Sequence, residues 1–388
     1  MGCVRVRRRF TIIDTVSDMR DMKEAIRTAA RQLGFQRCGI ARVEAPPHAD
    51  FVRQWVAEGK GGEMGYLERG LTKRLNPCLL LPEVRSIITL SYRYLPPPVP
   101  AIDWQQQLRG KIAAYALGPD YHGPIEGKLR ALAEHMGQLR PGVIARVYVD
   151  TGPVLEREWA AESGIGWFGK NTNILHTDDG SWFFLGEILT NVELEPDPPM
   201  PDRCGTCTRC LDGCPTGALG PGYELDARLC LSYLTIEHRG AIPPALRTRL
   251  GNWVFGCDIC QEVCPWNQRF ARDHRAADID LLFPYLPEIL CLTEEAFRRR
   301  FRHMALWRAR REGLARNAAV VLGNAGNPAA VPVLGEVLRR DPAVLVRGHA
   351  AWALGAIGGA AARRELEWAR VTETDGSVCG ELEAALAA

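Results

Sequence analysis

Residues 204–215 read Cys-Gly-Thr-Cys-Thr-Arg-Cys-Leu-Asp-Gly-Cys-Pro, and residues 257–265 give a shorter version, Cys-Asp-Ile-Cys-Gln-Glu-Val-Cys-Pro. The first run has the cysteine spacing of bacterial ferredoxins, in which three thiolates at two-residue spacing surround one corner of an iron–sulfur cube. The cysteine that precedes proline in such a run binds the other cluster. The two runs therefore predict two 4Fe-4S clusters in one small fold, close enough to pass single electrons.

The wiring that these runs predict is crossed, meaning that the last cysteine of each run binds the cluster held mainly by the other run. Cys230 completes the second cluster, because it is the only other cysteine inside the segment. Two zinc sites are the alternative, but zinc needs four thiolates per ion and gives no reason for two Cys-Pro endings. The predicted ligands are Cys204, Cys207, Cys210 and the distant Cys264 for cluster one, and Cys257, Cys260, Cys214 and Cys230 for cluster two.

Length and composition set the wider context. The chain has 388 residues, of which 46% are hydrophobic and 24% charged, with a net charge of +2. This is the size of two or three globular domains. The sequence shows no run of about 18 apolar residues and no apolar segment after the N-terminal arginines. We therefore expect a cytoplasmic monomer without a membrane span or signal peptide.

Three regions follow one another along the chain. In the first, a helical pattern over 21–33 and strand patterns over 86–90 and 145–149 predict an α/β fold. A proline-rich hinge over 194–201 separates it from the cysteine runs. We predict an α/β domain over 1–195, a ferredoxin-like two-cluster domain over 196–290 and an α-helical HEAT-like repeat domain over 291–388.

The third region repeats itself. Arg-Asn-Ala-Ala-Val-Val-Leu-Gly at 316–323 returns as Arg-Gly-His-Ala-Ala-Trp-Ala-Leu-Gly at 347–355. A period of roughly thirty to forty residues made of paired amphipathic helices is typical of a HEAT-type solenoid. Two copies cannot bury a core alone, so we expect them to dock on the preceding domain. Two unrelated alanine-rich helices are the alternative.

A glycine-rich stretch in the first region imitates two nucleotide-binding motifs. Residues 164–170 read Gly-Ile-Gly-Trp-Phe-Gly-Lys, which satisfies GxGxxG and fails the phosphate-loop pattern only at Asn171. Both motifs must follow a strand and open a helix. Here a helix is predicted before the glycines, over 154–163, and a strand after them, over 173–175. We therefore expect no nucleotide, and glycines that let the backbone approach something flat and bulky.

Asp150 closes the predicted strand over 147–149 and precedes Thr151-Gly152-Pro153, where a helix can begin. One interpretation is a helix N-cap. The other is a general acid at a strand end, where α/β folds usually place their chemistry. The pattern alone does not choose between them, but a bare ferredoxin would need no such extra domain, so we expect an active site in this region.

Taken together, these residues resemble the epoxyqueuosine reductase family over nearly the whole chain. The resemblance implies reduction of the oxirane of epoxyqueuosine to the cyclopentene of queuosine, in tRNA with a GUN anticodon, with electrons from a separate donor. It is carried by Lys73-Arg74-x2-Pro77, Asp120-Tyr121-His122, Val149-Asp150-Thr151-Gly152, Gly164-Ile165-Gly166 with Lys170-Asn171, both cysteine runs and the entry into the repeats over 307–317.

The resemblance also implies a cobalamin cofactor without a protein ligand to cobalt. In agreement, Ile125 stands where the cobalt-ligating Asp-x-His-x-x-Gly pattern would need glycine. The implied proton donor is Asp150, whose pKa would have to be raised by burial beside the corrin. The implied cofactor contacts are Arg74, Ala113, Asp150, Lys170, Ile174, Leu185, Ser232, Cys257 and Asp258.

Two other functions stay open on the sequence. A reductive-dehalogenase-like cobalamin and iron–sulfur reductase would share the cluster wiring, but it would carry a twin-arginine export signal, and no apolar segment follows Arg7-Arg8-Arg9. A non-enzymatic ferredoxin–HEAT electron-transfer adaptor would need neither Asp150 nor a cobalamin pocket.

A dense arginine run leads into the repeats. Between Arg298 and Arg316 lie eight arginines and a single acid, Glu312. Because guanidinium groups can grip phosphates bidentately, we predict that the solenoid holds tRNA here, with Arg308, Arg310 and Arg311 among the contacts. A solvated helix face is the alternative.

Overall fold

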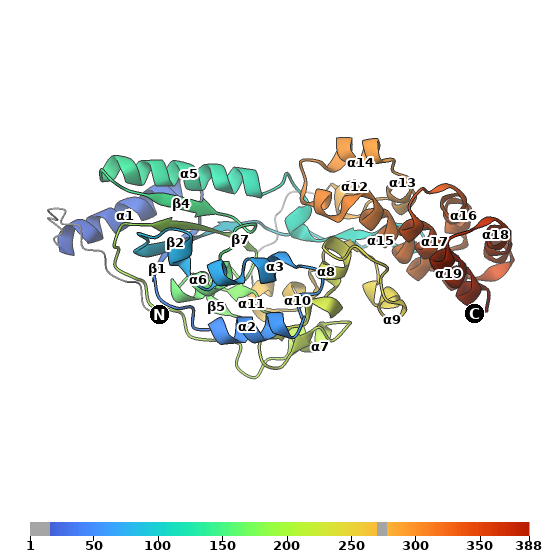
Figure 1. The fold of residues 1–388 in the computed structure, drawn as a ribbon, viewed down its shortest axis with the longest axis horizontal. Helices are drawn as coiled ribbons and strands as arrows, with labels where there is room; N and C mark the ends of the chain where they lie inside the picture. Colours follow the sequence, from blue (N-terminus) through green and yellow to red (C-terminus); the bar gives the residue numbers. More distant parts are fainter. Residues whose placement is uncertain (1–15, 270–277, 388) are drawn as a thin grey trace.

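Figure 1 shows the computed structural model, which describes residues 16–269 and 278–387. An α/β region, a cysteine-rich region and a helical region follow one another along an elongated molecule. The N-terminal arginines lie outside the described residues.

The first region is built on a four-stranded antiparallel sheet in the order β1-β2-β7-β4. The patterns over 21–33, 86–90 and 145–149 fall on α1, β2 and β4, so those element predictions are confirmed. Helices α1 and α5 cover one face, and α6 covers the other (Figure 1). The elements are α1 (Val16–Gln32), β1 (Arg37–Arg42), α2 (Ala49–Ala57), α3 (Tyr66–Arg69), α4 (Leu71–Arg74), β2 (Ser86–Arg93), β3 (Lys111–Ile112), α5 (His122–Leu139), β4 (Ala145–Tyr148), α6 (Glu156–Glu162), β5 (Trp167–Phe168), β6 (Ile174–Leu175) and β7 (Phe183–Thr190).

The second region consists of short elements that join the other two. Strand β10 pairs in parallel with β3 of the first region, with Phe255 opposite Ile112. Ile112 and Phe255 also belong to one apolar core with the C-terminal helices. The elements are α7 (Arg209–Gly213), β8 (Leu219–Gly220), β9 (Glu224–Leu225), α8 (Leu231–Ile236), α9 (Pro244–Arg247), β10 (Trp253–Phe255), α10 (Ile259–Glu262), α11 (Pro265–Gln268), α12 (Ile279–Leu282) and α13 (Leu286–Leu290).

The third region is a stack of helix pairs, as the repeat pattern predicts. The two repeated segments fall on α15 and α17, which pack against each other, and α15 also packs on β10 and α13. The side chain of Asn317 donates to the carbonyls of Thr235 and Val254 at 2.8 and 2.9 Å. The predicted docking on the preceding domain is therefore confirmed. The helices are α14 (Glu294–Phe301), α15 (Arg310–Ala325), α16 (Val331–Arg340), α17 (Val344–Ile357), α18 (Gly359–Thr372) and α19 (Gly376–Ala387).

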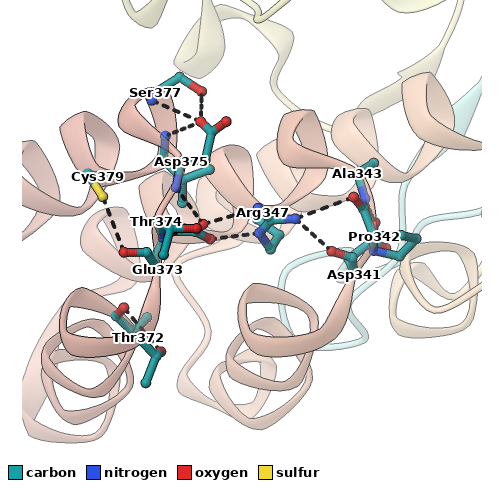
Figure 2. A network of polar contacts seen from close by, with 12 residues as sticks. Asp341, Pro342, Ala343, Arg347, Thr372, Glu373, Thr374, Asp375, Ser377 and Cys379 are labelled. Atoms are coloured by element: carbon teal, nitrogen blue, oxygen red, sulfur yellow. Dashed lines mark hydrogen bonds and ion pairs between the residues drawn. The ribbon is translucent and has the colours of Figure 1, made fainter.

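Polar contacts tie the loops of successive repeats together (Figure 2). Arg347 on α17 donates from Nε and Nη2 to the Glu373 carboxylate at 2.7 and 3.1 Å, and from Nη1 to the carbonyl of Asp341 at 3.0 Å. The hydrogen bond with Arg347 lowers the pKa of Glu373. The side chain of Asp341 in turn accepts two hydrogen bonds from Arg311 at 2.6 and 2.7 Å. One loop is thus held by arginines from two helices.

His349 on α17 makes the packing of the repeats against the second region sensitive to pH. Its Nε2 accepts from the Ile242 N–H at 3.1 Å, and its Nδ1 lies 2.7 Å from the Leu345 carbonyl. These partners require the neutral ring. Burial lowers the pKa of His349 to about 3, and the charge of Arg247 adds to the effect.

We expect His349 to contribute to acid instability. The pKa of His349 is lower in the folded protein than in the unfolded chain. Its contribution to the free energy of unfolding is therefore complete above the ordinary histidine pKa and is lost as the pH falls towards the pKa of the folded state. Between about pH 7.5 and pH 5.5, linkage predicts a loss of about 1.4 kcal/mol in the free energy of unfolding from this group. Urea unfolding followed by circular dichroism should show a smaller pH dependence in His349→Gln than in the exposed-histidine control His303→Gln. Equal slopes would contradict this explanation.

Candidate functional site

Five of the eight cysteines predicted as cluster ligands lie in or next to short elements. Cys214 follows α7, Cys230 precedes α8 and Cys264 precedes α11, while Cys210 and Cys260 lie within α7 and α10, which pack together. Each Cys-Pro pair therefore sits where the chain turns from one element to the next.

The influence of each thiol on the pKa of the others indicates which cysteines lie near one another. Burial raises the pKa of the Cys264 thiol, and the charges of Cys204 and Cys207 add to this. Burial likewise raises the pKa of Cys210 to about 11, with Cys264 as the largest charged contributor. Burial also raises the pKa of Cys230, and there the neighbouring charge is Cys214.

The second group gathers around Cys260. Burial raises the pKa of Cys260, and the charge of Cys230 contributes most after burial, with smaller contributions from Cys210 and Cys214. Burial and the charges of Cys260 and Cys230 act on Cys257 in the same way. Cys264 therefore lies with the first run and Cys230 with the second, although Cys210 also lies within reach of Cys260.

The glycine-rich stretch over 164–170 packs against the chain itself. A Cβ at Gly166 would lie 2.2 Å from the Leu175 carbonyl, and one at Gly169 would lie 2.6 Å from the Leu175 side chain. The expectation that these glycines admit something flat and bulky is therefore wrong. They allow the hairpin of β5 and β6 to close. Lys170, expected at the cofactor, instead donates to the carbonyls of Gly205 and Cys207 at 2.7 and 3.1 Å.

Asp150 lies where the three regions meet. Its Oδ2 is 3.2 Å from His122 Nε2 at the start of α5 and 3.4 Å from Arg308 Nη1, which comes from the third region. Arg308 Nε also contacts Glu237 of the second region at 2.6 Å. The Asp150 side chain is 46% exposed, so it is open to a substrate.

The N-cap interpretation of Asp150 is wrong. Helix α6 begins at Glu156 and its N-cap position is Leu155, so Asp150 lies several residues before the helix. Its φ of 52° is in the left-handed region, which non-glycine residues adopt rarely and at a cost. Strained backbone of this kind clusters at functional sites.

The raised pKa expected for Asp150 is also not what the structure gives. Burial does push the pKa of Asp150 upward, but the hydrogen bond with His122 and the charge of Arg308 outweigh it, and the pKa lies below its ordinary value. Conversely, burial lowers the pKa of His122, but hydrogen bonds to Asp150 and Asp120 raise it above its ordinary value. The contact between the two side chains therefore favours the ionised carboxylate of Asp150 and the protonated ring of His122.

Two glutamates next to Asp150 were not predicted from the sequence. Glu156, the first residue of α6, accepts a hydrogen bond from the Asp150 backbone N–H. Glu187 on β7 is fully buried, and neither side-chain oxygen has a hydrogen-bond partner among the described residues. Glu187 would have stood out in the sequence if its burial were predictable. Nothing in the sequence pattern, however, shows which face of β7 is covered.

The arginine run divides into surface and core. Arg311 is buried in its ion pair with Asp341, and Arg316 is fully buried, donating to the carbonyls of Leu234, His238 and Gly240. The prediction that Arg311 contacts phosphate is therefore wrong, and Arg308 is half-buried against Asp150 and Glu237. The exposed members of the run are Arg298, Arg299, Arg300, Arg302 and Arg310.

The expected cobalamin contacts fall into three neighbouring groups. Ala113, Ser232, Cys257 and Asp258 lie around the second cysteine run, where the Ala114 N–H donates to Asp258 at 2.7 Å. Ile174 and Leu185 pack together between α6 and β7. Arg74 is on α4 and donates to the Val154 carbonyl at 3.0 Å, close to Asp150. The charges of both Asp150 and Asp258 raise the pKa of Tyr115, so Tyr115 lies near two of these groups.

Buried polar atoms without partners in the described part of the chain show that this space suits a ligand. They include Arg74 Nε, Thr89 Oγ1 and Ser91 Oγ. Ser91 stands opposite Leu185 in the sheet and Thr89 opposite Glu187, so these side chains share the face that α6 covers. Buried polar groups are almost always paired in folded proteins. The residues present therefore fit a large group that carries both apolar and hydrogen-bonding surface.

Comparison with known proteins defines the class first. Residues 203–267 match a 4Fe-4S double cluster binding domain, and residues 305–387 match HEAT repeats. The chain is therefore an iron–sulfur protein with two 4Fe-4S clusters and a helical repeat domain, which rules out the zinc alternative. Residues 74–151 match the model of the epoxyqueuosine reductase QueG.

Whole-chain relatives identify the family. The chain is 42% identical to the epoxyqueuosine reductase of Xanthomonas campestris over 87% of its length and 96% of that protein. It is 43% identical to the Pseudomonas aeruginosa enzyme, covering 86% of this chain and 94% of that one. The chain belongs to the epoxyqueuosine reductase family and is an oxidoreductase.

Solved structures agree over almost the full length. The Bacillus subtilis epoxyqueuosine reductase, whose aspartate-bearing catalytic loop is swung out of the active site in that structure, aligns with a TM-score of 0.88 and 32% identity, covering 95% of this chain and 99% of that one. An epoxyqueuosine reductase with an epoxyqueuosine-modified tRNA stem loop aligns with a TM-score of 0.87, 32% identity and the same coverage. Within the described residues, no helix is long and apolar enough to cross a membrane.

Proposed function

We propose that this chain reduces epoxyqueuosine in tRNA to queuosine, with Asp150 supplying a proton to the oxygen that leaves the oxirane. The observation that carries the proposal is the position of Asp150, which is exposed, held at positive φ and contacted by His122 of the first region and Arg308 of the third. The substrate follows from the family, in which one solved structure holds an epoxyqueuosine-modified tRNA stem loop. We place this reaction in the cytoplasm and further propose that the protein acts as a monomer supplied by a separate electron donor.

Cobalamin would bind between Asp150 and the second cysteine run. Bound there, it would supply reduced cobalt as a nucleophile or electron donor toward the oxirane. Arg74, the peptide at Ala113, Ser232, Cys257 and Asp258 would hold its polar parts, and the unpartnered Arg74 Nε supports this assignment. The apolar surface of Ile174 and Leu185 would pack on its flat parts.

Two residues would manage the protons. Opening the oxirane to an alkene consumes an electron pair and two protons and releases water. Asp150 lies at the mouth of the site and would protonate the departing oxygen. His122 lies 3.2 Å away with a raised pKa and would return a proton to Asp150. Displacement of water by the bound cofactor would raise the pKa of Asp150, because it would remove solvent from a side chain that is now 46% exposed.

The clusters would deliver the electrons one at a time. Cys257 adjoins Asp258, and Ser232 lies two residues from Cys230, so the second cluster borders the proposed cofactor site. The first cluster then lies on the route from the external donor. Lys170 holds the loop of the first cluster by donating hydrogen bonds to the carbonyls of Gly205 and Cys207.

The exposed arginines of α14 and of the start of α15 would hold tRNA phosphates. Substituting Arg298, Arg302 and Arg310 together with glutamine should weaken tRNA binding and reduce its salt dependence by about 0.7 to 0.9 in log–log slope for each phosphate that is no longer neutralised. Filter binding across a salt series measures this. The matched control replaces Arg363, Arg364 and Arg370 on α18, which should leave the slope unchanged. If the Arg298, Arg302 and Arg310 variant keeps the same salt slope as the α18 control variant, these three arginines bind no phosphate.

One anaerobic assay tests the proposed function. Protein with both clusters, hydroxocobalamin, a chemical reductant and tRNA carrying epoxyqueuosine should yield queuosine, detected as a nucleoside lighter by one oxygen. Omitting cobalamin should abolish the product. Intact clusters that are reduced normally without any queuosine, with cobalamin present, would contradict the proposal and favour the electron-transfer adaptor.

A further inference from the structure

The turn that carries Asp150 is held in a strained shape. Asp150 has a φ of 52°, and the Thr151 N–H donates to the Val149 carbonyl at 2.5 Å, which closes a three-residue turn around it. Turns of this kind with positive φ are rare and strained. Such a conformation persists only where the surrounding structure holds it.

The group that holds this turn is Glu156. Its carboxylate accepts the hydrogen bond of the Asp150 backbone N–H, six residues earlier in the chain. Without Glu156, that N–H would have no acceptor among the residues that the structure describes. The Asp150 side chain is thereby left free to contact His122 and Arg308.

Glu156 is mounted on a rigid part of the fold. Helix α6 packs directly on β1, β2 and β7. The approach is so close that a Cβ at Gly39 on β1 would lie 2.2 Å from the Ser163 carbonyl at the end of α6. Glu187 on β7 lies beside Glu156 from within the sheet, fully buried. The helix that carries the acceptor for the Asp150 turn is therefore fixed against the sheet.

We propose that Glu156 is a positioning residue for the reaction, in which its carboxylate, fixed on α6 above the buried carboxyl of Glu187, keeps the strained turn in place and Asp150 aimed at the substrate. The inference rests on the proposed function, because it assigns Glu156 a role through Asp150. It adds a pair of acids that act on the reaction through the backbone of Asp150.

The pKa of Glu156 lies in a pH range where its titration can be seen in the pH profile of the enzyme activity. Burial raises the pKa of Glu156 to about 7, and the charge of Asp150 adds to this. Burial raises the pKa of Glu187 well above its ordinary value, with the charge of Glu156 as the next contribution. Glu187 therefore keeps its proton to a higher pH than an ordinary glutamate does, while the pKa of Glu156 lies at about 7. The ionised carboxylate accepts a hydrogen bond more strongly, so the turn is held more tightly as pH rises through this range.

The groups that face Glu156 are Asp150 from the turn, Glu187 from β7, Arg74 from α4, Tyr121 before α5 and Arg157 beside it on α6.

Two substitutions separate positioning from a general structural role. Glu156→Ala removes the acceptor, and we expect kcat to fall by about 10²-fold, the typical cost of a misplaced catalytic group. The KM for tRNA should stay within about twofold, because tRNA binding does not use Glu156. Glu156→Gln keeps an acceptor oxygen but does not titrate, so it should retain kcat within a few-fold and lose the component of the pH profile near neutrality. Glu162→Ala, at the other end of the same helix, is the matched control and should behave as wild type.

The outcomes are distinct. Glu156→Ala with the turnover of Glu162→Ala would overturn the inference, and so would Glu156→Gln with the pH profile of wild type. If Glu156→Ala does not fold, which its cluster absorbance reports, the pH profile of Glu156→Gln decides. Failure of the wild-type protein to form queuosine would instead overturn the proposed function, so the two failures are told apart by the wild-type assay.

Discussion

Asp150→Asn should lower the rate of queuosine formation by about 10²-fold or more, the typical size of a general-acid contribution. Asparagine preserves the shape of the side chain and tolerates the left-handed backbone at this position, so both clusters and bound cobalamin should be retained. Only the transferable proton is removed. Single-turnover assays with pre-reduced enzyme, together with absorption spectra of the clusters and cofactor, measure these effects separately.

The control for Asp150→Asn is Asp50→Asn, a change of the same kind at an exposed position on α2. It should leave turnover unchanged. Near-normal turnover in Asp150→Asn with the cofactors bound would show that the proton reaches the substrate by another route. His122, whose pKa is raised by its hydrogen bonds to Asp150 and Asp120, would then be the first group to test.

Cys214→Ala should abolish multiple turnover, because it removes a ligand from the cluster that borders the proposed cofactor site. Under the crossed wiring, Cys214 serves the cluster of Cys257 and Cys260, although it lies next to Cys210 in sequence. The cluster that survives in Cys214→Ala should therefore be cluster one. Iron content should fall by about half, since one of two 4Fe-4S clusters loses a thiolate.

Paired variants make the wiring test sharp. The electron paramagnetic resonance spectrum of reduced Cys214→Ala should match that of Cys257→Ala, and the spectrum of Cys210→Ala should match that of Cys264→Ala. If Cys214→Ala instead resembles Cys210→Ala, each run holds its own cluster and the crossed assignment is wrong.

The features that the sequence predicts best are those set by local spacing. The cluster runs depend on the number of residues between thiolates, and the repeats on recurring buried positions of α15 and α17, so both are visible without tertiary contacts. Asp150 was found for a similar reason, since it follows the strand pattern of β4. The alternative of an N-cap at Asp150 was open only because the start of α6 at Glu156 cannot be fixed within a few residues.

The features that could not be predicted depend on which side chains the fold covers. Arg310, Arg311 and Arg316 look alike in a charge run, yet Arg310 is exposed, Arg311 pairs with Asp341 and Arg316 caps carbonyls in the core. Glu187 is indistinguishable from a surface acid until α6 is placed over β7. The pKa of Asp150 depends on His122 and Arg308, which come from distant parts of the chain.

The most direct test of the proposed reaction is an electron count in the complete system. Enzyme holding both clusters and cobalamin is reduced by a titrated reductant, and the queuosine formed in tRNA is compared with the electrons consumed. We expect one queuosine for each electron pair, and none without cobalamin. Queuosine formed without cobalamin, or electrons consumed without removal of the epoxide oxygen, would contradict the proposed reaction.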